Sequence, residues 1–191
     1  MPKKTKNSTD FNDLLSKDPK VILEKWSYDN NYSDVYDKKK VFSDTNNSKL
    51  DFNSKLYEIA LWKINRRIVV NNLTESELKE LIKKKKIKEA INKLTSSENK
   101  GIGLPMASTI LHFYSNGKYP IIDQRSYRVI NKKEPEYGKS RKMSLGEIYE
   151  EYYSDCINFI KDNDLEKRGL DPKDVDKYTY QIDIERRNRN N

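Results

Sequence analysis

The sequence predicts an all-α fold, and three observations support this. Apolar residues recur at helical spacing through most of the chain. Several of these segments begin with residues that favour helix N-termini. Runs typical of strands are few, and the best of them, residues 119–122, is short and contains Pro120. We therefore expect this run to be a connector between helices.

The N-terminal third combines one helical segment with a polar one. Thr9 or Asp10 is a suitable N-cap for a helix that runs to about Trp26, and Pro19 can break this helix in two. Residues 27–50 are rich in Asn, Asp, Ser and Tyr, which predicts a loop. We expect residues 1–50 to form an N-terminal helix and a partly flexible polar loop, and residues 51–191 to form the main domain.

The middle of the chain contains two further helical regions. Apolar residues share a face over residues 53–70, which predicts one helix there. Thr74 and Glu77 then form the T-x-x-E pattern of a capping box. The apolar positions after it predict one or two short helices that end near Thr95.

Three more helices are expected in the C-terminal half. Residues 104–115 are predicted to form a helix that stops at Asn116-Gly117. Residues 145–162 and 172–187 have amphipathic patterns.

Composition excludes several classes of protein. The 191 residues are enough for one domain with a single core or for a compact two-lobed one. No apolar run reaches membrane length, and the basic N-terminus has no apolar region of the kind found in secretory signals. Cys156 and His112 are the only cysteine and histidine, which excludes an internal disulfide, a four-cysteine cluster and a multi-histidine metal centre. Both are expected to be structural, and no metal site is predicted.

The net charge of +8 admits two interpretations. A basic chain suggests a polyanionic partner, but an abundance of Lys, Asn, Ile and Tyr is also typical of AT-rich codon usage. The distribution of charge is more informative, because residues 161–191 are neutral whereas residues 124–142 carry a local charge of +5. A second cluster, Lys83–Lys86 with Lys88, lies in a predicted helix and is expected to be mostly solvated.

Residues 98–130 carry the most informative pattern. Gly101-Ile102-Gly103 stands between two predicted helices, where glycines allow the backbone to approach a ligand closely. Amides of such a turn, together with a helix N-terminus, form a site for a phosphate oxygen. A helix C-cap followed by an ordinary turn is the alternative. Asp123, twenty residues after Gly103, precedes another predicted helix, for which it is a natural N-cap.

This order of features resembles the helix–hairpin–helix (HhH-GPD) DNA glycosylase superfamily. In that family a glycine hairpin, its second helix, a Gly/Pro-containing loop and a catalytic aspartate follow one another at similar spacing. The resemblance implies a two-lobed all-α fold, with Asp123 as the catalytic carboxylate. The remaining matches are the buried helix face Ala107, Ile110 and Leu111, the loop residues Gly117 and Pro120, and the pair Arg128-Val129.

Departures from the family pattern narrow the implied activity. Members with lyase activity carry a Schiff-base lysine two residues after the second hairpin glycine, where this chain has Pro105. The four-cysteine iron–sulfur cluster of many members is missing as well. The resemblance therefore implies a small monofunctional enzyme without cofactor that removes a damaged or mismatched base from double-stranded DNA. We expect the protein to be an intracellular, cytoplasmic monomer in the same compartment as DNA.

The same resemblance implies which residues contact DNA. The base pocket is expected to include Trp62, Lys63 and Gln124, although Trp62, Tyr57, Phe113 and Tyr127 are also natural core residues. Contacts with the DNA backbone are expected from the hairpin and from the basic segment after Asp123, namely Lys100, Gly101, Ile102, Gly103, Arg125, Arg128, Lys132 and Lys133. The lysines between residues 83 and 88 are expected to add affinity that does not depend on sequence.

Two other functions remain open from the sequence. The chain could be a DNA-binding helix–hairpin–helix protein without activity, because Asn99-Lys100 replaces the usual Leu-Pro before the hairpin glycines. It could also be an interaction protein with no nucleic-acid partner, in which Asp123 is only a helix cap.

Overall fold

The computed structural model describes residues 7–24, 38–64, 68–135 and 142–188, except for the side chains of residues 7–10, 38–40, 62, 64 and 188. These residues form helices and no strands, and a single antiparallel bridge joins Val69 to Lys100. The all-α prediction is therefore confirmed. The helices are α1 (Asn7–Ser16), α2 (Pro19–Glu24), α3 (Lys38–Asn46), α4 (Phe52–Ile64), α5 (Glu75–Lys83), α6 (Ile87–Leu94), α7 (Leu104–Tyr114), α8 (Gln124–Asn131), α9 (Leu145–Asp162), the 3₁₀ turn η2 (Pro172–Asp174) and α10 (Val175–Asn188).

The chain folds into two compact units. Unit 1 comprises Met1–Trp26, Asp123–Pro135 and Asp155–Asn191, and unit 2 comprises Ser27–Ile122 and Glu136–Ser154. Each unit thus combines segments that are far apart in the sequence. No helix in the described part of the chain is long and apolar enough to cross a membrane.

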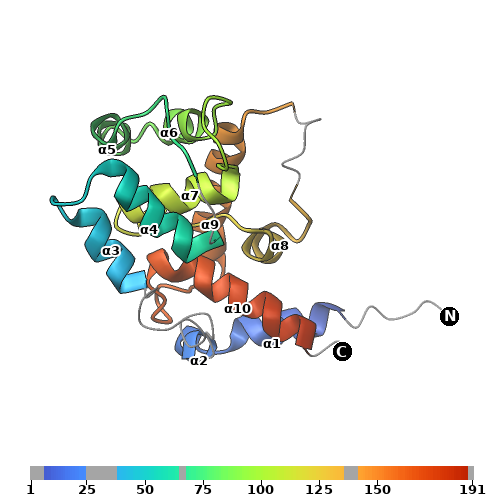
Figure 1. The fold of residues 1–191 in the computed structure, drawn as a ribbon. Coiled ribbons are helices and arrows are strands. Elements are labelled where there is room, and N and C mark those ends of the chain that lie inside the picture. The colour runs from blue at the N-terminus through green and yellow to red at the C-terminus, as the bar shows by residue number, and fades with distance from the viewer. Residues whose placement is uncertain (1–6, 25–37, 65–67, 136–141, 189–191) are drawn as a thin grey trace. The chain divides into compact units, whose positions relative to one another are not determined.

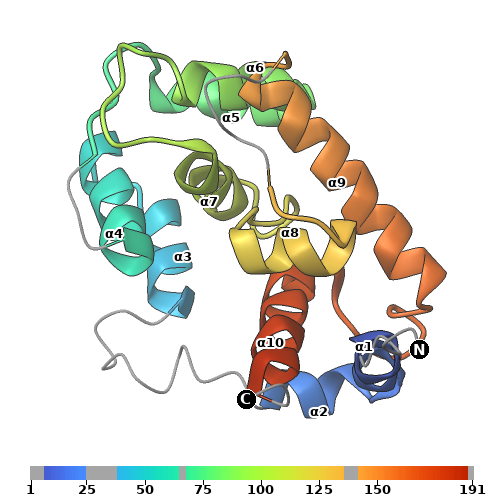
Figure 2. The same ribbon diagram turned by 90° about the vertical axis from the view of Figure 1, so that its right-hand side faces the viewer.

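Unit 1 is built around α10. This helix packs against α1, α2 and α8 (Figure 2). Its buried residues include Val175, Tyr178 and Ile182, and Cys156 near the end of α9 is buried in the same unit. The predicted break at Pro19 is confirmed, because α2 begins there.

Unit 2 is built around α7, which contacts α3, α4, α5 and α6 (Figure 1). Every residue of α7 from Met106 to Phe113 is buried. The ring of Phe42 on α3 lies 4.6 Å from the ring of Phe113. The prediction of a loop over residues 27–50 is wrong for α3. This helix has little apolar periodicity of its own, and Val41 and Phe42 stabilise it by packing in the unit.

In the segment between α4 and α6, the predicted helix length is wrong and the predicted capping box is confirmed. The helix expected over residues 53–70 is shorter, because the backbone of Val69 pairs with that of Lys100 rather than continuing a helix. The capping box is present as predicted. The backbone N–H of Glu77 donates to Thr74 Oγ1 at 3.3 Å, and the N–H of Thr74 donates to Glu77 Oε2 at 2.8 Å.

The run at residues 119–122 is a connector without regular secondary structure, as predicted. Tyr149 donates its hydroxyl to the carbonyl of Pro120 at 2.7 Å, and the N–H of Ile122 donates to Ser108 Oγ at 3.1 Å. His112 is fully buried, and its Nδ1 lies 2.9 Å from the carbonyl oxygen of Tyr119. The lone histidine is therefore a core residue that helps fix this connector.

Gly146, in the first turn of α9, lies very close to α6. A Cβ atom at this position would lie 2.3 Å from the carbonyl oxygen of Lys88 and 2.8 Å from Asn92 Oδ1. Because the carbonyl is backbone and cannot rotate away, we expect Gly146→Ala to lower the free energy of unfolding by about 2 kcal/mol or more, at the upper end of overpacking effects. Urea unfolding measures this loss.

Gly103→Ala is the matched control for this substitution. A Cβ at Gly103 would have its nearest neighbour, Pro105 Cδ, at 3.9 Å, which is an ordinary contact. Equal stability losses in the two variants would contradict the close approach of α9 to α6.

Candidate functional site

A tight turn joins α6 to α7, and the side chain of Asn99 holds it against the end of α6. Asn99 is 8% exposed. Its Nδ2 donates to the carbonyls of Lys93 and Leu94 at 2.9 and 3.0 Å, in the last turn of α6. Asn99 is therefore a helix-capping group.

The same turn is fixed from its other side by residues 69–71. Asn99 Oδ1 accepts the backbone N–H of Asn71 at 2.8 Å. Val69 and Lys100 exchange two backbone hydrogen bonds, of 3.0 and 2.9 Å. Hydrogen bonds on both sides thus fix the backbone up to Lys100. We call residues 99–103 the hairpin.

Lys100, Gly101 and Gly103 are exposed at the hairpin, whereas the side chain of Ile102 is buried in unit 2. Ile102 can therefore offer a ligand only its backbone. Gly101 has a φ of 75°, in the left-handed region that favours glycine. Gly103 is the N-cap of α7 with a φ of −93°, and a Cβ would fit there. The fold thus accounts for glycine at position 101 but not at position 103.

Asp123 is the N-cap of α8, as its position in the sequence predicts. Its Oδ1 accepts the backbone N–H groups of Arg125 and Ser126 at 2.8 and 2.9 Å. The hydroxyl of Ser126 donates to the carbonyl of Asp176 at 3.0 Å, which ties this turn to α10. The carboxylate is half-buried and held in one orientation at the positive end of the helix dipole.

Asp183 on α10 gathers three arginines. Its Oδ2 lies 3.3 Å from Arg125 Nη1, 2.8 Å from Arg128 Nη2 and 3.1 Å from Arg187 Nε, and the Asp183 side chain is only 3% exposed. The hydrogen bonds to Asp183 raise the pKa of Arg128 above its usual value. This cluster joins α8 to α10 and so supports the turn that carries Asp123.

The two arginines of α8 that were expected to contact DNA differ in accessibility. Arg128 is 12% exposed and also pairs with Glu134 at 3.2 Å, so its guanidinium is engaged inside unit 1. Arg125 is 34% exposed and lies over the ring of Tyr180 at 5.2 Å. Arg125 is thus the more available of the two for a ligand.

The other described basic residues of the segment 124–142 are more exposed to solvent than Arg128. Lys132 and Lys133 are exposed at the end of α8, and Lys132 has a φ of 56°. Lys139 and Arg141 fall outside the described residues. Among the described residues, the exposed positive charges after Asp123 are thus mainly Arg125, Lys132 and Lys133 in unit 1 and Lys142 in unit 2.

The residues expected at the base pocket are divided between the two units. Gln124 belongs to unit 1, is exposed and donates to Glu134 Oε2 at 3.1 Å. Trp62 and Lys63 belong to α4 in unit 2; Lys63 is half-buried, and the Trp62 side chain is outside the described residues. Phe113 is fully buried, as expected for a core residue, whereas Tyr57 is 50% exposed.

Within the described residues, no three His, Cys, Asp or Glu side chains are grouped as a metal site would require. The chain matches no protein-family model, no curated protein and no solved structure. A functional assignment therefore depends on the geometry of the hairpin, on the turn at Asp123 and on the resemblance of this part of the sequence to the helix–hairpin–helix DNA glycosylases.

Proposed function

We propose that this protein is a monofunctional DNA glycosylase of the helix–hairpin–helix type, which hydrolyses the N-glycosidic bond of a damaged or mismatched base. The hairpin is the observation that carries this proposal. It presents Lys100, Gly101 and Gly103 on the surface, and position 103 is a glycine although the fold has room for a side chain there. A phosphate that approaches the backbone closely explains this choice.

In the proposed reaction Asp123 stabilises the positive charge that develops on the sugar. Water adds to C1′, the bond from C1′ to the base nitrogen breaks, and the base leaves with a proton, which gives an abasic site. A fixed carboxylate beside C1′ stabilises the oxocarbenium-like transition state more than the ground state. The target base must leave the helical stack before this can occur.

Pro105 in the first turn of α7 supports simple hydrolysis. The proline stands where members with lyase activity carry their lysine, and it has no amine to form a Schiff base. The proposed product is therefore an intact strand with an abasic site.

A panel of duplexes tests the proposal. Each duplex carries one uracil, hypoxanthine, 8-oxoguanine, 3-methyladenine or mismatched pair, and the undamaged duplex is the control. We expect one of these duplexes to be cleaved after alkaline treatment and to stay intact without it. If no base is released from any of these duplexes, the glycosylase proposal is wrong, and the second candidate function described below is favoured.

Gly103→Ala tests the role assigned to the hairpin. We expect the variant to bind duplex DNA at least tenfold more weakly than the wild type, because the added methyl group would stand between the backbone and a phosphate. Fluorescence anisotropy at fixed salt measures the affinity. The melting temperature should stay unchanged, since the Cβ has room within the chain.

Lys79→Gln is the matched control, because it removes an exposed charge on α5, away from the hairpin. DNA affinity in Gly103→Ala equal to that of the wild type would argue against close contact between the hairpin and phosphate.

A DNA-binding protein without catalysis is the second candidate, and one observation favours it. Asp123 Oδ1 already accepts two backbone N–H groups of α8, which is a complete structural role for that oxygen. Salt-dependent DNA binding without base release from any duplex of the panel would support this candidate.

A further inference from the structure

A second basic feature of unit 2 is a hollow along α6, separate from the hairpin residues. It has a volume of about 750 Å³. We call it the α6 groove. It is lined by Asn72, Lys85, Lys86, Lys88, Glu89, Asn92, Lys93, Ser96 and Glu150, all of which belong to unit 2.

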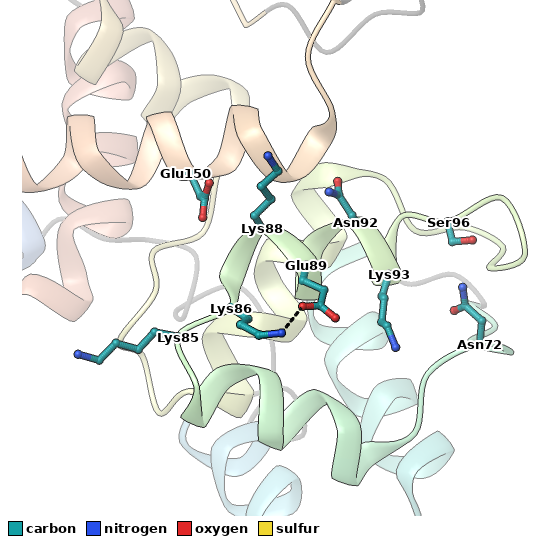
Figure 3. A pocket seen from close by; sticks show the side chains of 9 residues that line it. All are labelled: Asn72, Lys85, Lys86, Lys88, Glu89, Asn92, Lys93, Ser96 and Glu150. Carbon is teal, nitrogen blue, oxygen red and sulfur yellow. Dashed lines mark hydrogen bonds and ion pairs between the residues drawn. The ribbon is translucent and has the colours of Figure 1, made fainter.

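The lining of the α6 groove is suited to an anion. Four lysines face two glutamates, which gives a formal charge of +2, and the two asparagines and the serine add hydrogen-bond donors. Figure 3 shows the side chains of Lys86, Glu89 and Lys93 following one another along α6, with Ser96 on the loop beyond its C-terminal end. The groove therefore presents two lysines and a hydroxyl along this line, with the carboxylate of Glu89 between the lysines.

Glu89, which lies between these lysines, does not block them. Glu89 pairs with Lys86 at 3.1 Å, but the two side chains are 46% and 55% exposed. Ion pairs of such exposure contribute little to stability and exchange readily for another anion. Lys88 is paired with Glu147 at 2.6 Å, and this hydrogen bond raises its pKa.

The backbone at Lys85 adds an independent observation. Lys85 follows the C-cap of α5 with a φ of 58°, a position at which helices usually have glycine. Among the described residues Lys85 has no ion-pair partner, so no pairing with any of these residues accounts for a lysine there. A lysine at a backbone position that favours glycine is unfavourable for folding, so we attribute its presence to ligand binding.

The α6 groove leads towards the hairpin. Ser96 lines one end of the groove, and its carbonyl accepts the N–H of Asn99 at 3.0 Å. The eight residues of α6 span about 12 Å. With a rise of about 3.4 Å per nucleotide, this length corresponds to about three phosphates of one strand.

We infer that the α6 groove binds the phosphodiester backbone of a nucleic-acid strand that continues from the hairpin, with Lys85, Lys86 and Lys93 as its main contacts. The inference rests on the DNA-binding part of the proposed function and not on its catalytic part. The lysines contact phosphates only, so the groove contributes affinity without sequence preference.

Two triple variants test the inference. Lys85→Gln/Lys86→Gln/Lys93→Gln removes three charges from the groove, and Lys49→Gln/Lys79→Gln/Lys167→Gln removes three exposed charges elsewhere. We expect the groove variant to bind a 30-base-pair duplex at least tenfold more weakly and to flatten the plot of log affinity against log salt by about 2 to 3. The control variant should stay within about twofold of the wild type. Equal losses in both would overturn the inference, because net charge alone would explain them.

Lys85→Gly separates binding from folding. Glycine suits the left-handed backbone at this position, so the melting temperature should be unchanged or higher while DNA affinity falls. Unchanged DNA affinity in this variant and in the groove triple variant would overturn the inference, even where Gly103→Ala still weakens binding. The groove and the catalysis can also give different results. If the groove variants bind DNA more weakly but the wild-type protein releases no base from any duplex of the panel, the inference about the groove is supported and the proposed catalysis is refuted.

Tripolyphosphate distinguishes a nucleic-acid strand from a free phosphate ligand. We expect it to compete with the duplex only at high concentration. Tight binding of tripolyphosphate that the groove triple variant loses, with DNA affinity unchanged, would identify a small polyphosphate as the ligand and overturn the inference.

Discussion

Asp123→Asn is expected to reduce the rate of base release by about 10³-fold while leaving the protein folded. Asparagine is as good an N-cap as aspartate, so its side-chain oxygen can still accept the N–H groups of Arg125 and Ser126. The negative charge that the proposed mechanism places beside the sugar is lost, and removal of one such stabilising group lowers the rate by about two to three orders of magnitude. Single-turnover release from the best duplex of the panel measures this effect.

Asp123→Ala separates the two roles of this residue. The alanine variant loses both the cap and the charge, so it should match Asp123→Asn in activity but lower the free energy of unfolding by about 1 kcal/mol more. Asp171 supplies a matched control in the same unit, because its carboxylate also caps a turn by accepting the N–H of Lys173 at 3.1 Å. Asp171→Asn should release base at the wild-type rate. A rate in Asp123→Asn above one tenth of the wild-type value would exclude the proposed mechanism.

Local signals in the sequence predicted most of the helices. Pro19, the Thr74–Glu77 pair and Asp123 each act on neighbouring backbone, so their effects can be read from a few residues. The helix α3 lacks such a signal. Its sequence is mostly polar, and it is stabilised by contacts of Val41 and Phe42 with distant residues. For the same reason the expected helix over residues 53–70 was too long, since Val69 pairs with Lys100.

The candidate site could be predicted only in part, for a related reason. Asp123 and the hairpin glycines are recognisable because their order along the chain follows a family pattern. The roles of Asn99 and Asp183 depend on partners that come together only in the fold. The spacing of Asp183 and Arg187, four residues apart on a predicted helix, was the one local signal for that cluster. It could not indicate that Arg125 and Arg128 join it.

Asp183→Ala is expected to have the largest effect on stability, with a loss of about 3 kcal/mol or more in the free energy of unfolding. The carboxylate is 3% exposed and is the shared partner of three arginines. Its removal leaves the guanidinium of Arg128, itself only 12% exposed, without its buried counter-ion. Breaking a buried pair by removing one partner typically costs about 3–5 kcal/mol. Urea unfolding measures the loss, and Glu80→Ala, which removes an exposed pair with Lys84, should cost much less than Asp183→Ala.

The loss of an arginine from this cluster should lower the stability of the protein less than the loss of Asp183. Removing Arg187 leaves Asp183 paired with Arg125 and Arg128, and removing Arg128 still leaves two guanidinium groups near the carboxylate. Each single arginine-to-alanine variant should therefore cost less than Asp183→Ala, with Arg187, which is 53% exposed, costing least. Asp183→Ala combined with Arg128→Leu should recover part of the loss, because it also removes the buried unpaired charge. An Arg187→Ala variant less stable than Asp183→Ala would show that Asp183 is not the residue on which the cluster depends.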